Sequence, residues 1–171
     1  MSENKGKVTM KGNPLTVQGS ELNVGDKAPD ATLVDGGMQE VSLKDFFGKV
    51  LVISAVPSLD TPVCDLETKR FNKEADGLGD GVEVLTVSMD LPFAQKRWCG
   101  AEGVDKVKVL SDHKYASFGQ EFGVLIKELR LLARVVFVVD AEGVIRHIEW
   151  VKEVGDEPDY HRVISAAKKL V

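Results

Sequence analysis

The chain has 171 residues, the length of a single domain, and 43% of them are hydrophobic, 6% aromatic and 29% charged. This ordinary globular composition excludes a disordered, collagen-like or low-complexity chain. The 22 basic and 27 acidic residues give a formal net charge of −5 without a basic run, so we expect no binding to nucleic acid or to an anionic membrane surface.

The first seven residues contain no apolar stretch of the kind found in a signal peptide. The longest apolar run, 50–56, is far shorter than the ~20 residues that span a bilayer. Only two cysteines are present, Cys64 and Cys99, and they form neither a Cys-x-x-Cys pair nor, with the three dispersed histidines, a zinc motif. We therefore expect a cytoplasmic protein without a disulfide scaffold or a metal site.

Extended segments recur along the chain and are separated by turn residues. A hairpin at about residues 8–17 comes first, with a Lys-Gly-Asn-Pro turn at 11–14. The strands predicted after it are 31–34, 49–56, 82–88, 106–110, 134–140 and 144–151. The runs 49–56 and 134–140 are β-branched and apolar without alternation, which is typical of strands covered on both faces. The turn at 140–143 makes the last two strands antiparallel, so the sheet is expected to be mixed.

Helical patterns lie between these strands. One helical turn is predicted at 45–48, and helices at 62–76, 93–99, 114–122 and 158–170. Gly100 is a plausible C-cap that ends the second of these helices at Cys99, and Glu67 is expected on the solvated face of the first. Alternating strands and helices predict an α/β fold, a mixed central sheet flanked by helices, within a single domain of residues 1–171.

The segment Pro57-Ser-Leu-Asp-Thr-Pro-Val-Cys64 joins a buried strand to a helix. Thr61 is a good N-cap and Pro62 suits the first helical position, which places Cys64 in the first turn. Unpaired backbone N–H groups and the helix dipole there favour the thiolate, the nucleophilic form. The helical period puts Cys64 on the apolar stripe, at the rim of the core in a shallow pocket. The alternative is a small, inert, buried cysteine.

The motif Pro57-x-x-x-Thr61-x-x-Cys64 resembles the peroxidatic-cysteine motif of the peroxiredoxins, and the full segment resembles their thiol peroxidase branch. Further segments agree in order along nearly the whole chain: Gly12-Asn-Pro, Asp90-Leu-Pro-Phe-Ala-Gln95, Trp98-Cys99-Gly-Ala-Glu-Gly103, Leu132-Ala-Arg134 and Glu157-Pro-Asp-Tyr160. The resemblance implies a thioredoxin-like fold and a peroxidase that needs no metal or organic cofactor.

The resemblance also implies a role for each site residue. Cys64 would attack a hydroperoxide and become a sulfenic acid, and Cys99 would resolve it as an intramolecular Cys64–Cys99 disulfide. Thr61 would hydrogen-bond the sulfur or the peroxide, Arg134 would stabilise the thiolate and the leaving oxygen, and Pro57 would shield the sulfur from water. Each has a plainer alternative: an N-cap for Thr61, a polar strand start for Arg134, a strand stop for Pro57 and a buried thiol beside Trp98 for Cys99.

The substrates implied are hydrogen peroxide and organic hydroperoxides, the reductant is thioredoxin and the assembly is a homodimer. Two other functions remain open on the residues alone. A redox sensor would use the same disulfide without significant turnover. A thioredoxin-like disulfide reductase is disfavoured because its chemistry requires a Cys-x-x-Cys pair.

Overall fold

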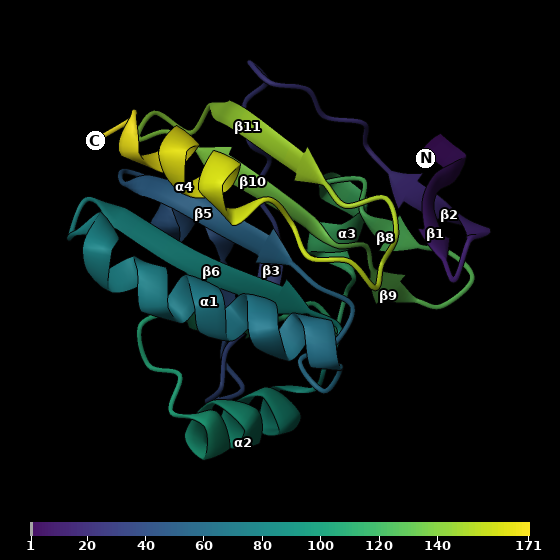
Figure 1. The fold of residues 1–171 in the computed structure, drawn as a ribbon, viewed down its shortest axis with the longest axis horizontal. Coiled ribbons are helices and arrows are strands. Elements are labelled where there is room, and N and C mark those ends of the chain that lie inside the picture. Colours follow the sequence, from purple (N-terminus) through teal and green to yellow (C-terminus); the bar gives the residue numbers. More distant parts are fainter. Residues whose placement is uncertain (1) are drawn as a thin grey trace.

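The computed structural model describes residues 2–171, which form two sheets and four α-helices (Figure 1). The large sheet has seven strands in the order β11-β10-β5-β6-β7-β3-β4, and the small sheet has four in the order β1-β2-β8-β9. The strands are β1 Ser2–Met10, β2 Asn13–Gly19, β3 Thr32–Val34, β4 Glu40–Ser42, β5 Val50–Ala55, β6 Val82–Ser88, β7 Lys108–Ser111, β8 Leu125–Ile126, β9 Leu131–Leu132, β10 Val135–Val139 and β11 Ile145–Trp150. The helices are η1 Leu43–Phe46 (3-10), α1 Pro62–Leu78, α2 Pro92–Glu102, α3 Ser117–Glu121 and α4 Tyr160–Lys168.

The large sheet is mixed, as predicted. Strands β5, β6 and β7 run parallel, whereas β10 pairs antiparallel with both β5 and β11. All residues of β5 and β10 are buried, which explains why both read as continuous apolar runs. The carboxyl end of β5 therefore leads out of the middle of the sheet directly into the segment before α1.

The two faces of the large sheet bury different partners. Helices α1 and α4 lie side by side on one face (Figure 1), where Phe71 of α1 and Val163 of α4 pack on Val52 and Val136. The opposite face packs on α3 and the small sheet. Helix α4 buries Val163, Ile164 and Ala167 against the sheet. The arrangement covers both faces of the central strands, as the predicted α/β layering requires.

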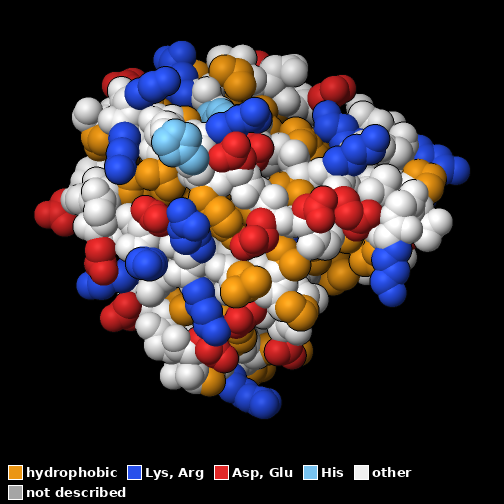
Figure 2. All heavy atoms as spheres, in the orientation of Figure 1, with side chains coloured by type: hydrophobic (Ala, Val, Ile, Leu, Met, Phe, Trp, Pro, Cys, Tyr) orange, Lys and Arg blue, Asp and Glu red, His pale blue; other side chains and the backbone are white. Residues whose placement is uncertain are grey.

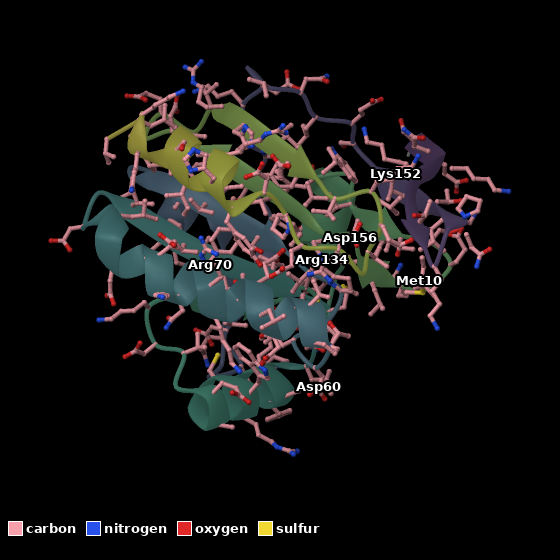
Figure 3. The ribbon with its side chains drawn as sticks, in the orientation of Figure 1. Met10, Asp60, Arg70, Arg134, Lys152 and Asp156 are labelled. Carbon is pink, nitrogen blue, oxygen red and sulfur yellow. The ribbon has the colours of Figure 1, made fainter. Side chains whose placement is uncertain are left out.

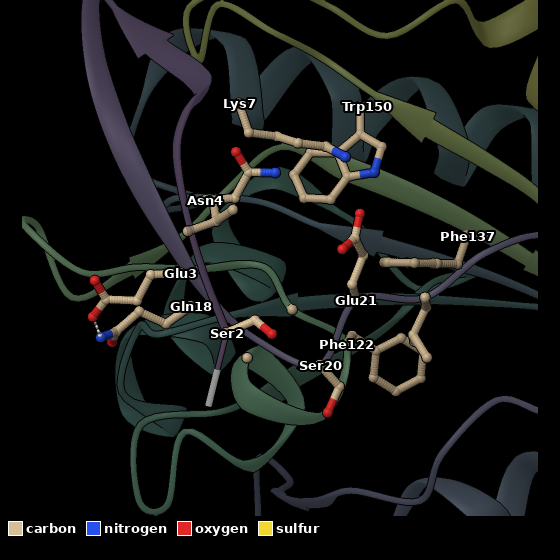
Figure 4. Close-up of a pocket in the computed structure, with 14 residues that line it drawn as sticks. Ser2, Glu3, Asn4, Lys7, Gln18, Ser20, Glu21, Phe122, Phe137 and Trp150 are labelled. Carbon is tan, nitrogen blue, oxygen red and sulfur yellow. Dashed lines mark hydrogen bonds between the residues drawn. The ribbon is translucent and has the colours of Figure 1, made fainter.

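The N-terminal hairpin is longer than predicted and belongs to the small sheet. Strands β1 and β2 span residues 2–19, and β2 also pairs with β8. On one side of the hairpin a cavity of about 190 Å³ separates it from β10 and β11, lined by Lys7, Phe122, Phe137 and Trp150 among others (Figure 4). The hairpin tip, residues 11–12, instead contacts the loop after β11. The hairpin is thus fastened to the domain both at its tip and through the pairing of β2 with β8.

Several element boundaries differ from the sequence prediction. The second predicted helix continues past Cys99 to Glu102 and ends at Gly103, which adopts the left-handed conformation with φ of 67°. Gly100 therefore lies inside the last turn, because a glycine within a helix costs only about 1 kcal/mol and does not end it. The third predicted helix shortens to α3, which follows Ala116, a residue with φ of 51°.

The visible surface over α1 and α4 carries acidic and basic side chains interspersed with small apolar patches (Figure 2). Neither sign of charge dominates this face. No helix within residues 2–171 is long and apolar enough to cross a membrane.

Candidate active site

Cys64 lies in the first turn of α1, where the sequence places it. Thr61 precedes the helix in an extended conformation and Pro62 occupies its first position. The side chain of Cys64 is 0% exposed and packs with Val56 and Leu59, with Trp98 against this small cluster. The predicted shallow pocket at the rim of the core is therefore wrong: the segment after β5 and helix α2 cover the sulfur completely.

Arg134 contacts the sulfur directly. Its Nη2 lies 3.2 Å from Cys64 Sγ, although 70 residues separate the two in sequence. The side chain is 2% exposed, and Nε and Nη2 both donate to the carbonyl oxygen of Val154, at 3.0 and 2.8 Å. Figure 3 shows Arg134 between the N-terminal end of α1 and the loop that carries Lys152 and Asp156. A guanidinium at this distance can donate a charge-assisted hydrogen bond to the sulfur.

Glu67 is a buried member of the site that the sequence prediction placed in solvent. It is 0% exposed, its Oε1 lies 3.7 Å from Arg134 Nη1, and its Oε2 accepts a hydrogen bond from Ser54 Oγ at 2.7 Å. The prediction was wrong because Glu67 lies one turn after Cys64 and so shares the buried stripe of the helix. Burial raises the pKa of Glu67 to about 7, although Arg134 and Ser54 oppose this.

The raised pKa makes Glu67 a source of pH-dependent stability. Because folded Glu67 binds its proton more tightly than the unfolded chain does, stability present below pH 4.5 is lost as pH rises through about 7. We expect Glu67→Gln to gain stability relative to the wild type over this window, by up to ~3 kcal/mol. Urea unfolding at pH 5, 6, 7 and 8 measures this. The control is Glu74→Gln, because Glu74 is a partly exposed glutamate of the same helix that pairs with Arg70. If the free energy of unfolding changed equally with pH in the wild type and in Glu67→Gln, the prediction would be contradicted.

The segment before α1 is fixed by Asp90, which follows β6. Its carboxylate accepts hydrogen bonds from Ser58 Oγ and from the Leu59 backbone N–H, at 2.7 and 2.8 Å. Pro57 is buried at the start of this segment. The Thr61 hydroxyl donates to the Ser58 carbonyl at 2.8 Å and makes no cap hydrogen bond. Its proton is thus engaged away from the sulfur, and its oxygen remains as a hydrogen-bond acceptor.

Cys99 lies in the last turn of α2 and is a free thiol, as is Cys64. It is half-buried and packs with the cluster between the sheet and α1, whereas its neighbour Trp98 also packs against the cluster that contains Cys64. Burial raises the pKa of the Cys99 thiol, so the packed thiol is a weak nucleophile.

Polar contacts hold α2 against α1 beside the two cysteines. The indole N–H of Trp98 donates to Asp65 Oδ1 at 3.0 Å. Lys69 Nζ pairs with Asp65 at 3.0 Å and with Glu102 at 2.8 Å. These contacts are partly exposed, where single ion pairs contribute at most about 1 kcal/mol. Helix α2 is also fixed to the sheet, because the buried Gln95 donates to Ser88 Oγ at 3.0 Å and to the Leu110 carbonyl oxygen at 2.8 Å.

The described chain, residues 2–171, contains no group of three or more His, Cys, Asp or Glu side chains placed to hold a metal ion. The reactive groups that the structure brings together are a thiol, a guanidinium and a carboxylic acid, all buried at the amino-terminal end of α1.

Comparison with known proteins agrees with this arrangement over nearly the whole chain. The Redoxin family model matches residues 23–164. A thiol peroxidase of Bacillus subtilis is 57% identical over 164 residues, which cover 96% of this chain and 98% of the relative. A peroxiredoxin-like protein from Aquifex aeolicus superposes with a TM-score of 0.90 at 46% identity, covering 96% of each chain. A thiol peroxidase from Chromobacterium violaceum, 21% identical with a TM-score of 0.83, shares the fold. The predicted thioredoxin-like fold is thereby confirmed.

Proposed function

The chain belongs to the redoxin family, in its thiol peroxidase branch, and we propose that Cys64 is the thiol with which it reduces hydroperoxides. The observation that carries this assignment is the contact of Arg134 Nη2 with the buried Cys64 Sγ at 3.2 Å, in the first turn of α1. A cysteine that was only a packing residue would not need a buried cation beside its sulfur.

The first chemical step transfers one oxygen atom to Cys64. The thiolate attacks the terminal oxygen of the hydroperoxide, an S–O bond forms and the O–O bond breaks, and two electrons leave the sulfur. The leaving alkoxide or hydroxide takes a proton and departs as alcohol or water, while Cys64 becomes a sulfenic acid. Arg134 stabilises the negative charge first on sulfur and then on the leaving oxygen. Thr61 orients the peroxide through its hydroxyl oxygen, and Pro57 keeps water from the sulfur.

The second step is resolution by Cys99. Its thiolate attacks the sulfur of the Cys64 sulfenic acid, an S–S bond forms and hydroxide leaves as water. A dithiol reductant then returns two electrons to the Cys64–Cys99 disulfide. We infer that this reductant is thioredoxin, because membership of the thiol peroxidase branch implies a thioredoxin-type reductant, and thiol–disulfide exchange would return the two electrons.

Catalytic turnover separates this function from the other two that the sequence left open. In a coupled assay, hydrogen peroxide or cumene hydroperoxide, thioredoxin, thioredoxin reductase and NADPH are mixed with the protein, and peroxide loss is followed with NADPH oxidation. Sustained consumption of peroxide and NADPH in equal amounts supports the peroxidase function. One stoichiometric turnover without recycling would point to a redox sensor. Reduction of insulin disulfides without peroxide consumption would point to a disulfide reductase.

The cellular setting follows from the same chemistry. Two free thiols suit a compartment that keeps thiols reduced, so we place the protein in the cytoplasm beside its reductant. We also infer a homodimer, which the resemblance to the thiol peroxidases implies; Leu66, Leu91 and Phe93 are 53–67% exposed, and they are apolar side chains that another chain could cover. Sedimentation velocity of the reduced protein at micromolar concentration tests the dimer, and a single monomeric species would refute it.

Disulfide formation should be coupled to local unfolding. Cys64 lies in the first turn of α1 and Cys99 in the last turn of α2, with β6 between them, and the two side chains pack in different clusters. The two Cα atoms of a disulfide lie within ~7 Å, so we expect the first turn of α1, the segment around Cys99, or both to melt on oxidation. Hydrogen exchange should show lost protection at residues 61–68 and 91–100, and unchanged protection in β5 and β10.

The disulfide itself offsets part of this loss, since closing a loop of about 35 residues stabilises the chain by ~3 to 4.7 kcal/mol in the chain-entropy model. Oxidised and reduced proteins are thus expected to have similar overall stability. The Cys99→Ser variant treated with the same oxidant is the control, because it forms a sulfenic acid without a disulfide. Equal protection of both segments in the reduced and oxidised proteins would refute the unfolding step.

A further inference from the structure

The guanidinium of Arg134 is anchored by a single backbone carbonyl. Both Nε and Nη2 donate to the oxygen of Val154, and the same Nη2 contacts Cys64 Sγ. Its Nη1 has no hydrogen-bond partner, and Glu67 lies 3.7 Å away. The position of the Val154 carbonyl therefore determines where the positive charge lies relative to the sulfur. Val154 belongs to the loop between β11 and α4, not to a strand or helix that would hold it rigidly.

The N-terminal hairpin, near its tip, holds the loop that carries Val154. The Thr9 N–H donates to the Lys152 carbonyl at 2.7 Å, and the Val154 N–H donates to the Thr9 carbonyl at 2.9 Å. Residue 153 between these bonds is a glutamate whose carboxylate faces the hairpin turn. It accepts hydrogen bonds from the Gly12 N–H at 2.9 Å, Thr9 Oγ1 at 3.0 Å, the Lys11 N–H at 3.1 Å and the Gly155 N–H at 3.3 Å.

These donors bind one carboxylate from two separate segments of the chain. The Gly12 N–H makes the largest contribution to lowering the pKa of Glu153, so the group is ionised at neutral pH and its hydrogen bonds are charge-assisted. Lys11 and Gly12 adopt positive φ, 50° and 80°, which turns two successive N–H groups toward the same anion. Glu153 therefore fixes the hairpin tip and its own loop to each other in one geometry.

We propose that Glu153 is a positioning residue for the peroxidase reaction: by joining the hairpin tip to the loop after β11, it sets the Val154 carbonyl and hence the placement of Arg134 on Cys64. The proposal rests on the proposed function only for its effect on peroxide reduction. The N-terminal hairpin is, on this view, a support of the active site, which it reaches through the Glu153 carboxylate, the two Thr9 backbone hydrogen bonds and the Val154 carbonyl.

Glu153→Ala and Glu153→Gln in the full chain test this, each in a Cys99→Ser background so that Cys64 is the sole thiol. Glu128 supplies matched controls, because its carboxylate also accepts a backbone N–H of the hairpin, that of Thr16, at 2.7 and 3.0 Å, but from the β8 side. One measurement is the second-order rate of Cys64 oxidation by hydrogen peroxide. The other is the thiolate absorbance at 240 nm against pH, which needs no peroxide.

We expect Glu153→Ala to lower the oxidation rate about tenfold, within the ~10²-fold that a 1 Å displacement of a catalytic group can cost. Glu153→Gln keeps one acceptor oxygen, so its oxidation rate should fall less than that of Glu153→Ala. Formation of the Cys64 thiolate should shift to higher pH in both Glu153 variants, and the shift should be larger in Glu153→Ala than in Glu153→Gln. The Glu128 variants should stay within about twofold of the parent in rate. If Glu153→Ala does not fold, the proposal is tested by comparing the oxidation rate and the thiolate titration of Glu153→Gln with those of Glu128→Gln.

Rates and thiolate titrations that match between the Glu153 and Glu128 variants would overturn the proposal. A parent protein that shows no peroxide reduction would instead refute the proposed function. In that event the thiolate titration still tests whether Glu153 positions Arg134, since it reports the charge around Cys64 and not turnover.

Discussion

Replacing Cys64 with serine should reduce peroxide consumption to the uncatalysed background. A serine hydroxyl is not ionised at neutral pH, so the buried cation at 3.2 Å would face a neutral oxygen in place of a thiolate. The serine is nearly isosteric and the site is fully buried, so the fold should persist. The coupled thioredoxin assay measures turnover, and far-UV circular dichroism confirms folding. Substantial activity in a folded Cys64→Ser protein would disprove the assignment of the nucleophile.

Cys99→Ser provides the matched comparison, since it removes the other thiol of the chain. This variant should reduce one equivalent of hydroperoxide per chain at the wild-type rate and then stop, because its sulfenic acid finds no partner for an intramolecular disulfide. Mass spectrometry should detect one added oxygen on Cys64. Continued turnover with thioredoxin alone would show that the reductant attacks the sulfenic acid directly and that Cys99 is not needed.

Local rules suffice to predict the reactive end of α1. The strand before it is buried on both faces and therefore apolar throughout, and an N-cap residue followed by proline marks the helix start. These signals act between residues a few positions apart, so they place Cys64 in the first turn without knowledge of the rest of the chain. The same reasoning fails at Gly100, because a glycine near the end of a helix can equally well lie inside its last turn.

The surroundings of the sulfur depend on contacts that no local rule encodes. Arg134 reaches Cys64 across 70 positions, and its anchor at Val154 is a backbone carbonyl, which leaves no side-chain signal in the sequence. Glu67 could have been found from its place on the helical stripe, one turn after Cys64. A general preference for exposed glutamates led to the opposite expectation. The role of Glu153 depends on how the hairpin folds back, which only the tertiary structure reveals.

Replacing Arg134 with methionine should lower the rate of Cys64 oxidation by ~10²–10³-fold, the cost of deleting a donor that stabilises developing charge. Methionine preserves part of the length and packing but removes the hydrogen bonds to Cys64 Sγ and the Val154 carbonyl. The thiolate should form at higher pH, and the rate should stay low even at pH values where the thiol is fully ionised, because the leaving oxygen has also lost its cationic partner. Stopped-flow oxidation from pH 6 to pH 10 separates these two effects.

Glu67 must be controlled for in this experiment. Without Arg134 its buried carboxylate loses the nearby cation that opposes the effect of burial, so its pKa should rise further and the neutral form should prevail. The double variant Arg134→Met, Glu67→Gln removes that ionisation, and its rate should equal that of Arg134→Met alone. Arg146→Met, which removes an exposed guanidinium paired with Asp140, is the surface control. Full recovery of the rate at high pH would show that Arg134 acts on thiolate formation alone, and a rate unchanged at every pH would remove it from the active site.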